Sequence, residues 1–235
     1  MASPPRPTAL THIRTWVFDL DNTLYPASAH VFPQIDVRMK QFIAEYLNMT
    51  LEEAFTLQKA YYHTYGTTLR GLMLNHGLEP DRFLDYVHAI DHSVLAPDPA
   101  LDQALAALPG RKIVFTNGSE SHAVNVVERL GIARHFEGIF DIKAAAYIPK
   151  PEPETYRALV ERFVFDPCTA AMFEDSPANL TPAAAIGMTT VLVRAESCQW
   201  CHAPEHTDSH LEHCDYVTDD LIGWLASAGA EFISA

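Results

Sequence analysis

From residue 99 onward the chain alternates short apolar runs with stretches of helical periodicity, and this rhythm restricts the fold more than any other feature. The apolar runs predict strands at 112–115, 138–141, 170–173, 190–193 and 216–217. The periodic stretches predict helices at 100–108, 119–130, 154–162 and 177–186, followed by a terminal helix. Strands that alternate with helices form a mostly parallel sheet covered on both faces. The sequence therefore predicts an α/β fold.

One earlier strand, at 15–18, is separated from this region by a helical block. Helices are predicted at 30–47, 67–75 and 81–90, and Thr50 with Glu53 forms the pattern of a capping box that opens another helix. Because this block interrupts the alternation after a single strand, we interpret 26–97 as an inserted, all-helical cap. The core is then expected to comprise 12–25 and 98–235.

The first eleven residues are rich in proline and lack the apolar block of a signal peptide, so we interpret 1–11 as a flexible leader and expect a cytoplasmic protein. No apolar run approaches the roughly 20 residues that cross a bilayer. Sixteen basic and thirty acidic side chains give a formal charge of −14. That charge argues against a nucleic acid polymer or an anionic membrane as partner, but permits a small phosphorylated molecule whose charge is neutralised locally.

Polar clusters lie at the ends of the predicted strands or in the loops beyond them. They are Asp19-Leu-Asp21-Asn-Thr23, Thr116-Asn117-Gly118, Lys150 and Glu174-Asp175-Ser176. Ligands of open α/β sheets collect at the carboxyl ends of the strands. Carboxylates from two strands can share a hard cation such as Mg²⁺, while Lys150 supplies a positive charge and Thr116 and Asn117 supply hydrogen-bond donors. We therefore expect these clusters to converge on one site.

These four clusters, in this order, resemble the motifs of the haloacid dehalogenase superfamily, and the resemblance extends from about residue 15 to residue 217. It implies a Rossmann-like core with an inserted cap. It further implies that Asp19 attacks phosphorus and carries a phosphoryl group as an aspartyl-phosphate. Asp21 would protonate the leaving alcohol and then activate water. Positions 19 and 21 of an extended segment lie on the same side, which suits this division of roles.

The resemblance also assigns the cofactor and the phosphate site. Mg²⁺ would bind the Asp19 carboxylate, the Asp21 backbone carbonyl and Asp175, with Glu174 acting directly or through water. Thr116, Asn117 and Lys150 would bind the transferring phosphoryl group. A cation is also needed on physical grounds, because a carboxylate that attacks an anionic phosphoryl group is otherwise repelled.

Three other functions are compatible with parts of this pattern. Dehalogenases of the superfamily attack carbon and need neither Mg²⁺ nor the second aspartate, so Asp21 and the Glu174-Asp175 pair favour a phosphatase. A mutase would keep all four motifs and differ mainly in its cap. A binding module that has lost turnover would have no need of Asp21. The sequence leaves the oligomeric state open.

The run 61–72 and the tail 215–221 resemble the corresponding segments of pyrimidine 5′-nucleotidases. UMP or CMP is therefore the expected substrate, with phosphoglycolate or a sugar phosphate as the alternative. Tyr65, Arg70 and His76 are the cap residues we would test for contact with base or ribose, through stacking or hydrogen bonds. Each also has an ordinary interpretation: packing within the cap, a solvated helix face or a helix-end histidine.

A stretch rich in cysteine and histidine, 198–214, departs from the family pattern and lengthens the loop before the last strand. Cys198, Cys201, His206 and Cys214 could hold zinc, since Cys-x-x-Cys is a common half-site. The Cys-x-x-Cys-His spacing also fits haem attachment, which the expected cytoplasmic location disfavours. A polar surface loop is the interpretation that we prefer.

Overall fold

A six-stranded sheet, in the order β3-β2-β1-β4-β5-β6, lies at the centre of the computed structural model, which describes residues 10–194 and 212–234. The strands are β1 Thr15–Phe18, β2 Arg111–Phe115, β3 Gly138–Phe140, β4 Ala170–Glu174, β5 Thr189–Val193 and β6 Tyr216–Thr218. All neighbouring pairs among these described strands are parallel. The predicted α/β fold with a mostly parallel sheet is confirmed.

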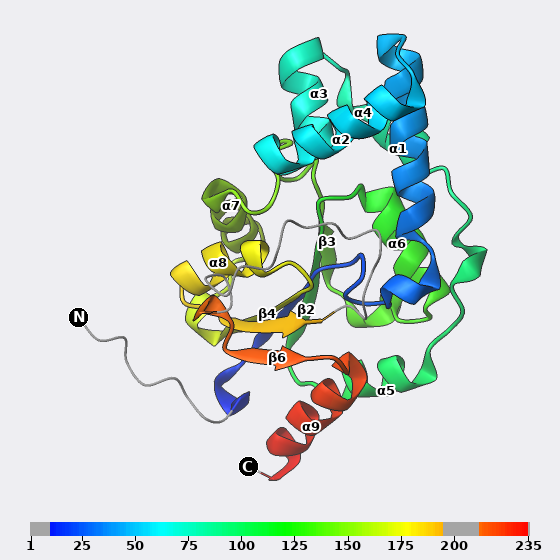
Figure 1. Cartoon of the computed structure of the whole chain (residues 1–235). Coiled ribbons are helices and arrows are strands. Elements are labelled where there is room, and N and C mark those ends of the chain that lie inside the picture. The colour runs from blue at the N-terminus through cyan, green and yellow to red at the C-terminus, as the bar shows by residue number, and fades with distance from the viewer. Residues whose placement is uncertain (1–9, 195–211, 235) are drawn as a thin grey trace.

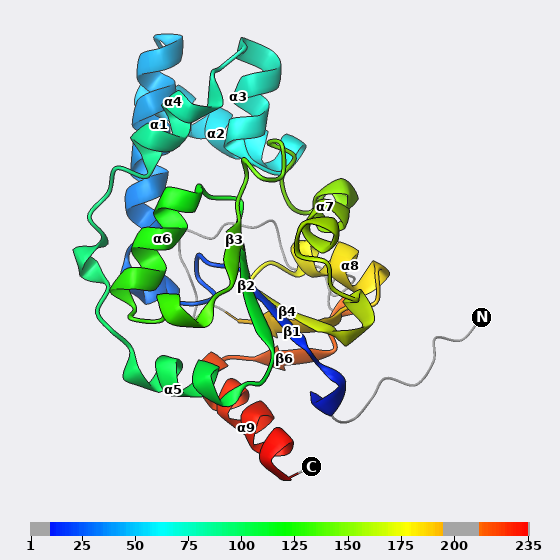
Figure 2. The same cartoon turned by 180° about the vertical axis from the view of Figure 1, so that it is seen from behind.

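Helices cover both faces of the sheet, as Figures 1 and 2 show from opposite sides. They are α5 Pro99–Ala107, α6 Glu120–Arg129, α7 Pro153–Phe163, α8 Pro177–Ala185 and α9 Leu221–Ser234. Side chains of β1 alternate between the faces. Trp16 and Phe18 join the hydrophobic cluster beneath α5, α6 and α9, whereas Val17 joins the cluster beneath α7 and α8. Burial on both faces explains why every residue of β1 is apolar apart from Thr15.

Four further helices form the predicted cap, at the top of Figure 1: α1 Phe32–Leu47, α2 Leu51–Tyr65, α3 Thr68–His76 and α4 Pro80–Val87. The predicted capping box is present, because the Glu53 backbone N–H donates to Thr50 Oγ1 while the Thr50 N–H donates to Glu53 Oε2. The cap has a hydrophobic cluster of its own, which includes Phe42, Leu72 and Phe83.

The loop between β3 and Lys150 joins the core to the cap. Ile142 in this loop is buried within the cap cluster. Lys143 Nζ lies 2.8 Å from Asp81 Oδ1, and Tyr147 donates its hydroxyl to the same carboxylate. Arg70 Nη1 donates to the backbone carbonyl of Tyr147 at 3.4 Å. The cap therefore contacts the loop that leads into Lys150, one of the predicted site residues.

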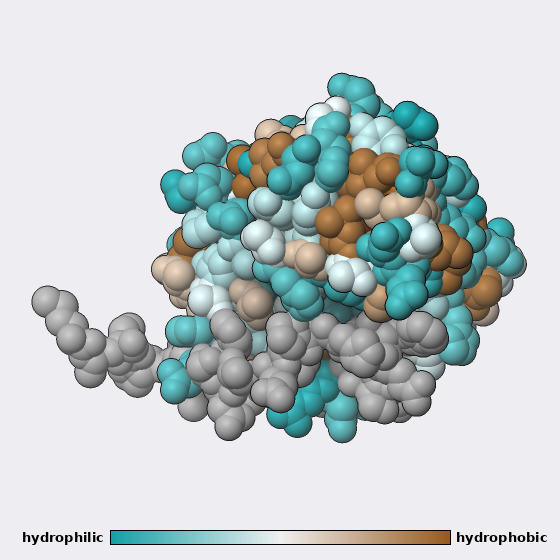
Figure 3. All heavy atoms as spheres, turned by 45° about the horizontal axis from the view of Figure 1, so that its top comes forward, coloured by the Kyte–Doolittle hydropathy of each residue, from teal (hydrophilic) through white to brown (hydrophobic). Residues whose placement is uncertain are grey.

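The predicted leader lies outside the described residues except at its end, where Leu10–His12 form a short 3-10 helix. Leu10 is buried there, and its N–H donates to Glu231 Oε2. Among the described residues, no helix combines the length and the apolar character needed to cross a bilayer. Figure 3 shows hydrophobic side chains among polar ones on the surface of the molecule. The exposed hydrophobic residues of the cap include Leu51 and Phe55.

Candidate active site

The predicted clusters meet at one edge of the sheet because neighbouring parallel strands end there. Asp19 follows β1, and its N–H donates to the Phe173 carbonyl of β4 at 2.9 Å. Thr116 follows β2, and its N–H donates to the Phe140 carbonyl of β3 at 3.0 Å. These backbone hydrogen bonds continue the parallel pairing beyond the ends of the strands. They thereby fix the backbone positions of Asp19 and Thr116.

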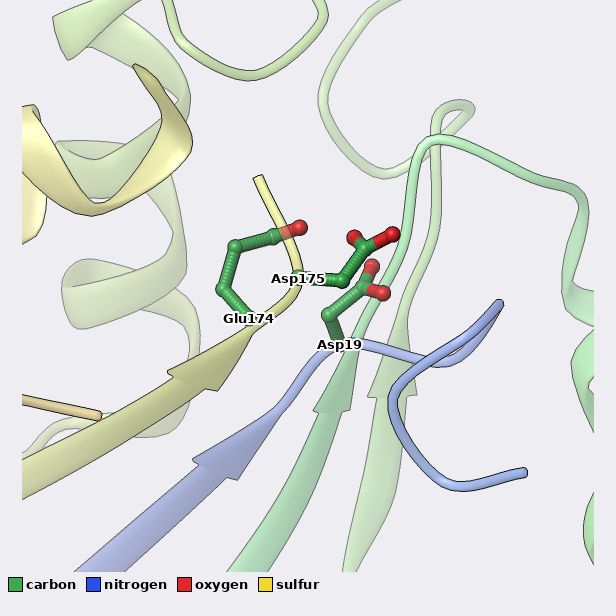
Figure 4. A group of neighbouring side chains, drawn as sticks. All are labelled: Asp19, Glu174 and Asp175. Atoms are coloured by element: carbon green, nitrogen blue, oxygen red, sulfur yellow. The ribbon is translucent and has the colours of Figure 1, made fainter. Parts of the chain in front are cut away.

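Three carboxylates converge at this edge. Asp19, Glu174 and Asp175 each offer an oxygen such that all three atoms lie within 4.8 Å of one another. Figure 4 shows Asp19 and Asp175 approaching each other from the ends of β1 and β4. Burial, followed by the charge of Glu174, raises the pKa of Asp19 to about 7, and the same two causes raise the pKa of Asp175 well above its usual range. A divalent cation with oxygen ligands fits this cluster, since it would offset the repulsion.

Lys150 supplies the positive charge next to this cluster. Its Nζ donates to Asp19 Oδ1 at 2.6 Å, to Glu174 Oε2 at 2.7 Å and to the Phe115 carbonyl at 3.0 Å. An ammonium group has three N–H donors, so these contacts use all of them. Burial favours a lower pKa for Lys150, but the charges of Asp19 and Glu174 outweigh it and raise that pKa above its ordinary value. Lys150 is therefore a fixed cation, buried at 2% exposure.

Asn117 and Thr116 use their side chains within the protein. The Asn117 amide accepts from the Lys150 N–H at 2.8 Å and donates to the Lys150 carbonyl at 3.2 Å, so it fixes the backbone that carries Lys150. Thr116 Oγ1 accepts from the N–H of Gly118 at 2.9 Å and keeps its own hydroxyl hydrogen to donate. Both residues line the cavity described below, as expected for a phosphate site.

Asp21 reaches the site through a tight turn, whereas an extended segment was predicted from the sequence. The Leu24 N–H donates to the Leu20 carbonyl, and Asn22 adopts the left-handed conformation with φ 62°. Asn is one of the few non-glycine residues that tolerates this conformation. The turn places the side chain of Asp21 in the same cavity as that of Asp19.

Two side chains hold Asp21 in place. His122 Nε2 lies 2.8 Å from Asp21 Oδ1, and the Tyr25 hydroxyl donates to the same oxygen. Burial favours a raised pKa for Asp21, but the charge and hydrogen bond of His122, together with the Tyr25 hydrogen bond, lower it to about 2. Neither Tyr25 nor His122 was among the residues predicted from the sequence. Their only signal is position, because His122 lies in the first turn of the helix that follows a strand-end cluster.

A cavity of about 650 Å³ extends from these carboxylates into the cap. Its cap walls are mostly apolar and include Phe32, Ile35, Met39, Leu69, Phe83, Leu84 and Val87. A buried polar cluster interrupts them: Asp36 Oδ1 accepts from Gln58 Nε2 and from Lys59 Nζ, each at 2.8 Å. The cavity thus has a charged end formed by the core and a largely apolar end formed by the cap.

The sequence pattern of one family, described as haloacid dehalogenase-like hydrolase, matches residues 13–187 of this chain. The chain belongs to the haloacid dehalogenase-like hydrolases. The carboxylate cluster of this hydrolase and the lysine beside it both lie on the part of the chain that the family pattern covers.

One curated protein is similar to this hydrolase over most of the chain. Phosphate metabolism protein 8 from Saccharomyces cerevisiae is 30% identical over 205 residues, which cover 80% of this chain and 63% of that protein. The chain therefore spans less than two thirds of this curated relative.

Among solved structures, the HAD phosphatase from Thermococcus onnurineus has a TM-score of 0.57 and 17% identity, covering 87% of this chain and 93% of that one. L-2-haloacid dehalogenase from Xanthobacter autotrophicus has a TM-score of 0.56 and 19% identity, covering 93% and 97%. These likenesses show the shared fold.

The three cap candidates of the hydrolase do not line the cavity. The Tyr65 hydroxyl donates to Asn75 Oδ1, Arg70 contacts the Tyr147 carbonyl, and His76 Nε2 lies 2.7 Å from the Tyr61 hydroxyl. Tyr61 and Tyr65 stand four positions apart on α2 and pack against each other. The neighbouring stripe of α2, which holds Gln58, Lys59 and Tyr62, faces the cavity instead.

Three of the four candidate zinc ligands lie outside the described residues, because Cys198, Cys201 and His206 fall within 195–211. Cys214 is described. It is half-buried and packs against the hydrophobic cluster beneath α7 and α8. This position makes Cys214 part of the packing of the core.

Proposed function

We propose that this hydrolase is a Mg²⁺-dependent phosphomonoesterase that forms an aspartyl-phosphate on Asp19. The observation that carries the proposal is the placement of Lys150 Nζ, 2.6 Å from Asp19, beside a cluster of three carboxylates. Asp19, Asp175 and the backbone carbonyl of Asp21 would hold the metal, with Glu174 bound directly or through water. When bound, Mg²⁺ supplies positive charge against the repulsion between a carboxylate and a phosphoryl group.

The chain's own groups then divide the reaction into two displacements. In the first, a carboxylate oxygen of Asp19 bonds to phosphorus while the bond from phosphorus to the ester oxygen breaks, and Asp21 gives that oxygen a proton. A bound phosphate raises the pKa of a neighbouring carboxyl, which favours the protonated form of Asp21 at this stage. In the second, Asp21 takes a proton from water, whose oxygen displaces Asp19 and releases inorganic phosphate.

A pyrimidine nucleoside 5′-monophosphate is the substrate that we propose. The resemblance of 61–72 and 215–221 to pyrimidine 5′-nucleotidases supports it. The apolar walls of the cap can contact the faces of a planar base, while Asp36, Gln58 and Lys59 offer hydrogen-bonding groups to its edge. Phosphoglycolate has no planar base that could contact these apolar walls.

Relatives support the choice of phosphorus over carbon. The yeast relative is named for phosphate metabolism, and the structure of the HAD-hydrolase YfnB from Bacillus subtilis was solved bound to magnesium. Dehalogenases share the fold. The second aspartate and the pair Glu174-Asp175 favour phosphoryl transfer, and they also weigh against a pure binding module.

The test is a panel of UMP, CMP, phosphoglycolate, glucose 6-phosphate and p-nitrophenyl phosphate, assayed with Mg²⁺ and with EDTA. We expect turnover that needs Mg²⁺ and is fastest with UMP or CMP, and we expect Asp19→Asn to abolish it. Turnover of phosphoglycolate or glucose 6-phosphate alone would defeat the nucleotide proposal while sparing the phosphatase. Conversion of glucose 6-phosphate to an isomer would indicate a mutase. If no ester reacts, a binding module becomes the better account.

Metal binding has its own readout, independent of turnover. A ligand that binds only the folded state raises the melting temperature. MgCl₂ should therefore raise the melting temperature of the wild-type chain, and Asp175→Asn should remove most of that rise. Asp81→Asn, which changes an aspartate at the cap surface, is the matched control and should respond to Mg²⁺ like the wild type. An equal response of Asp175→Asn and wild type would contradict the proposed metal site.

A further inference from the structure

His122 is buried completely, with 0% exposure, directly behind the candidate acid/base. Its Nε2 lies 2.8 Å from Asp21 Oδ1, and its Nδ1 lies 3.0 Å from His92 Nε2. Both ring nitrogens are therefore engaged. Because burying an imidazole without partners is unfavourable, these two contacts explain how the core accommodates it.

The faces of the His122 ring are also constrained. His88 stacks on it with the ring centroids 4.6 Å apart and the planes 8° from parallel. The His88 ring is itself anchored, since its Nδ1 lies 2.8 Å from the hydroxyl of Ser119, the residue that caps α6. His88 and His92 belong to the segment that returns from the cap to the core, between α4 and α5. The orientation of His122 thus depends on that segment.

The contact with His122 determines which carboxylate oxygen of Asp21 is available to the substrate. Oδ1 accepts from both Tyr25 and His122, and a carboxylate oxygen has two lone pairs. With Oδ1 used in this way, Oδ2 is the oxygen that can carry a proton to a leaving group. Two donors on one oxygen also restrict rotation of the side chain, and general acid catalysis requires the acid within hydrogen-bond reach of the leaving atom.

We propose that His122 is a positioning residue for Asp21. Its ring is held in place by His88 and His92, which lie on the segment between α4 and α5. This inference rests on the proposed function, because it assumes that Asp21 protonates a leaving alcohol. It goes beyond the motif residues by assigning a role to a histidine cluster built from two separate parts of the chain. Removing the Nε2 donor should leave substrate binding intact and impair the proton transfer.

The test exploits the leaving group. An alkoxide needs a proton as it departs, whereas nitrophenolate is stable without one. The value of kcat/KM reports the steps through release of the first leaving group, so it separates the two cases. We expect His122→Leu to lower kcat/KM roughly 100-fold for an alkyl phosphate, the usual scale of general acid catalysis. For p-nitrophenyl phosphate the expected loss is below about 10-fold. The alkyl ester used is whichever of UMP, glycerol 3-phosphate and phosphoglycolate the wild type hydrolyses fastest.

Three further variants complete the design. His122→Gln keeps an N–H donor at a similar reach and should recover most of the alkyl phosphate activity. His92→Leu removes the contact to His122 Nδ1 at a half-buried position, so this variant should fold even if His122→Leu does not. It should lower kcat/KM for the alkyl phosphate more than for p-nitrophenyl phosphate, by a smaller factor than His122→Leu does. His135→Leu is the matched control: His135 Nε2 bonds to Asp102 at 2.7 Å, away from the cavity, and its loss should change neither substrate.

Each other outcome overturns the inference. Equal losses on both substrates would make His122 merely structural, and unchanged kinetics would leave it without a role. Hydrolysis of p-nitrophenyl phosphate by the wild type, with no alkyl ester turned over, would mean that Asp21 is not an effective acid. If the wild type hydrolyses no ester at all, the proposed function has failed and this inference fails with it.

Discussion

At the scale of single residues, the site is organised around one buried cation. Lys150 is enclosed by Asp19, Glu174 and a backbone carbonyl, and it is fixed from behind by Asn117. Because its donors are used within the protein, its contribution to a phosphorylated ligand is chiefly electrostatic. It also keeps two carboxylates near each other in the folded protein, so it has both a functional and a structural effect.

Substitution of Lys150 tests both effects. Lys150→Met should lower kcat for p-nitrophenyl phosphate by roughly 100-fold or more, as for other lost electrostatic contacts. It should also lower the free energy of unfolding by about 3–5 kcal/mol, because buried carboxylates lose their partner. The measurements are steady-state kinetics and urea unfolding. Lys143→Met, which breaks an exposed ion pair, should change stability by less than about 1 kcal/mol. Equal effects of the two variants would contradict this account.

A second prediction concerns the cap end of the cavity. Lys59→Met removes a charged hydrogen-bond donor from the cavity wall and should raise KM for UMP roughly 10-fold. KM for phenyl phosphate should change little, because its unsubstituted ring offers no hydrogen-bond acceptor to Lys59. Lys40 is the matched control, since both lysines lie over the Phe55 ring but only Lys59 lines the cavity. A parallel change for both substrates, or the same change in Lys40→Met, would rule out recognition by Lys59.

At the scale of elements, close packing fixes how the cap helices meet. Gly71 of α3 faces the Tyr61 ring of α2, and a Cβ atom added there would overlap that ring. The same tyrosine binds His76 through its hydroxyl. A small residue at position 71 therefore permits the close approach of the two helices, which also sets which stripe of α2 faces the cavity.

Gly71→Ala should for this reason destabilise the chain by about 1–3 kcal/mol, the usual cost of overpacking, even though alanine favours helices. Urea unfolding followed by far-UV circular dichroism measures the change. Thr64→Ala, at an exposed position of α2, should alter stability by less than about 0.5 kcal/mol. A stability gain in Gly71→Ala would show that the helices can move apart at no cost.

Sequence patterns predicted the elements well and their contacts less well. Each described strand lies within one residue of its predicted bounds, because apolar runs between turn signals are local features. Parallel topology indicated that the strand-end carboxylates share one edge of the sheet, whereas the place of Lys150 in this group rested also on the resemblance to the haloacid dehalogenase superfamily. By contrast, the prediction for Tyr65 named a residue that does not line the cavity, since an amphipathic pattern does not reveal which polar positions border a cavity. His122 escaped prediction because its partner, Asp21, is 101 positions away.

At the scale of the whole molecule, a side chain of the core packs within the hydrophobic cluster of the cap. Ile142 belongs to the core loop by sequence but is buried at 1% exposure in the hydrophobic cluster of the cap. Arg70 and Asp81 contact the same loop from the cap side. We therefore expect the two parts to unfold together, because neither completes its packing alone.

Urea unfolding of the wild type should accordingly give coincident transitions by tryptophan fluorescence and by far-UV circular dichroism. Trp16 lies in β1 and Trp224 packs against the same hydrophobic cluster of the core, whereas circular dichroism includes the helices of the cap. Ile142→Ala should lower the free energy of unfolding by about 2–5 kcal/mol. Val37→Ala, at an exposed position of the cap, should change it by less than about 0.5 kcal/mol. Two separated transitions in the wild type would show that the cap folds independently.

The contact between Leu10 and α9 has a practical consequence. It brings the two ends of the described chain together on the side of the sheet opposite the cap. Attachment of the protein to a solid support through a side chain beside this contact would therefore leave the cap facing the solution.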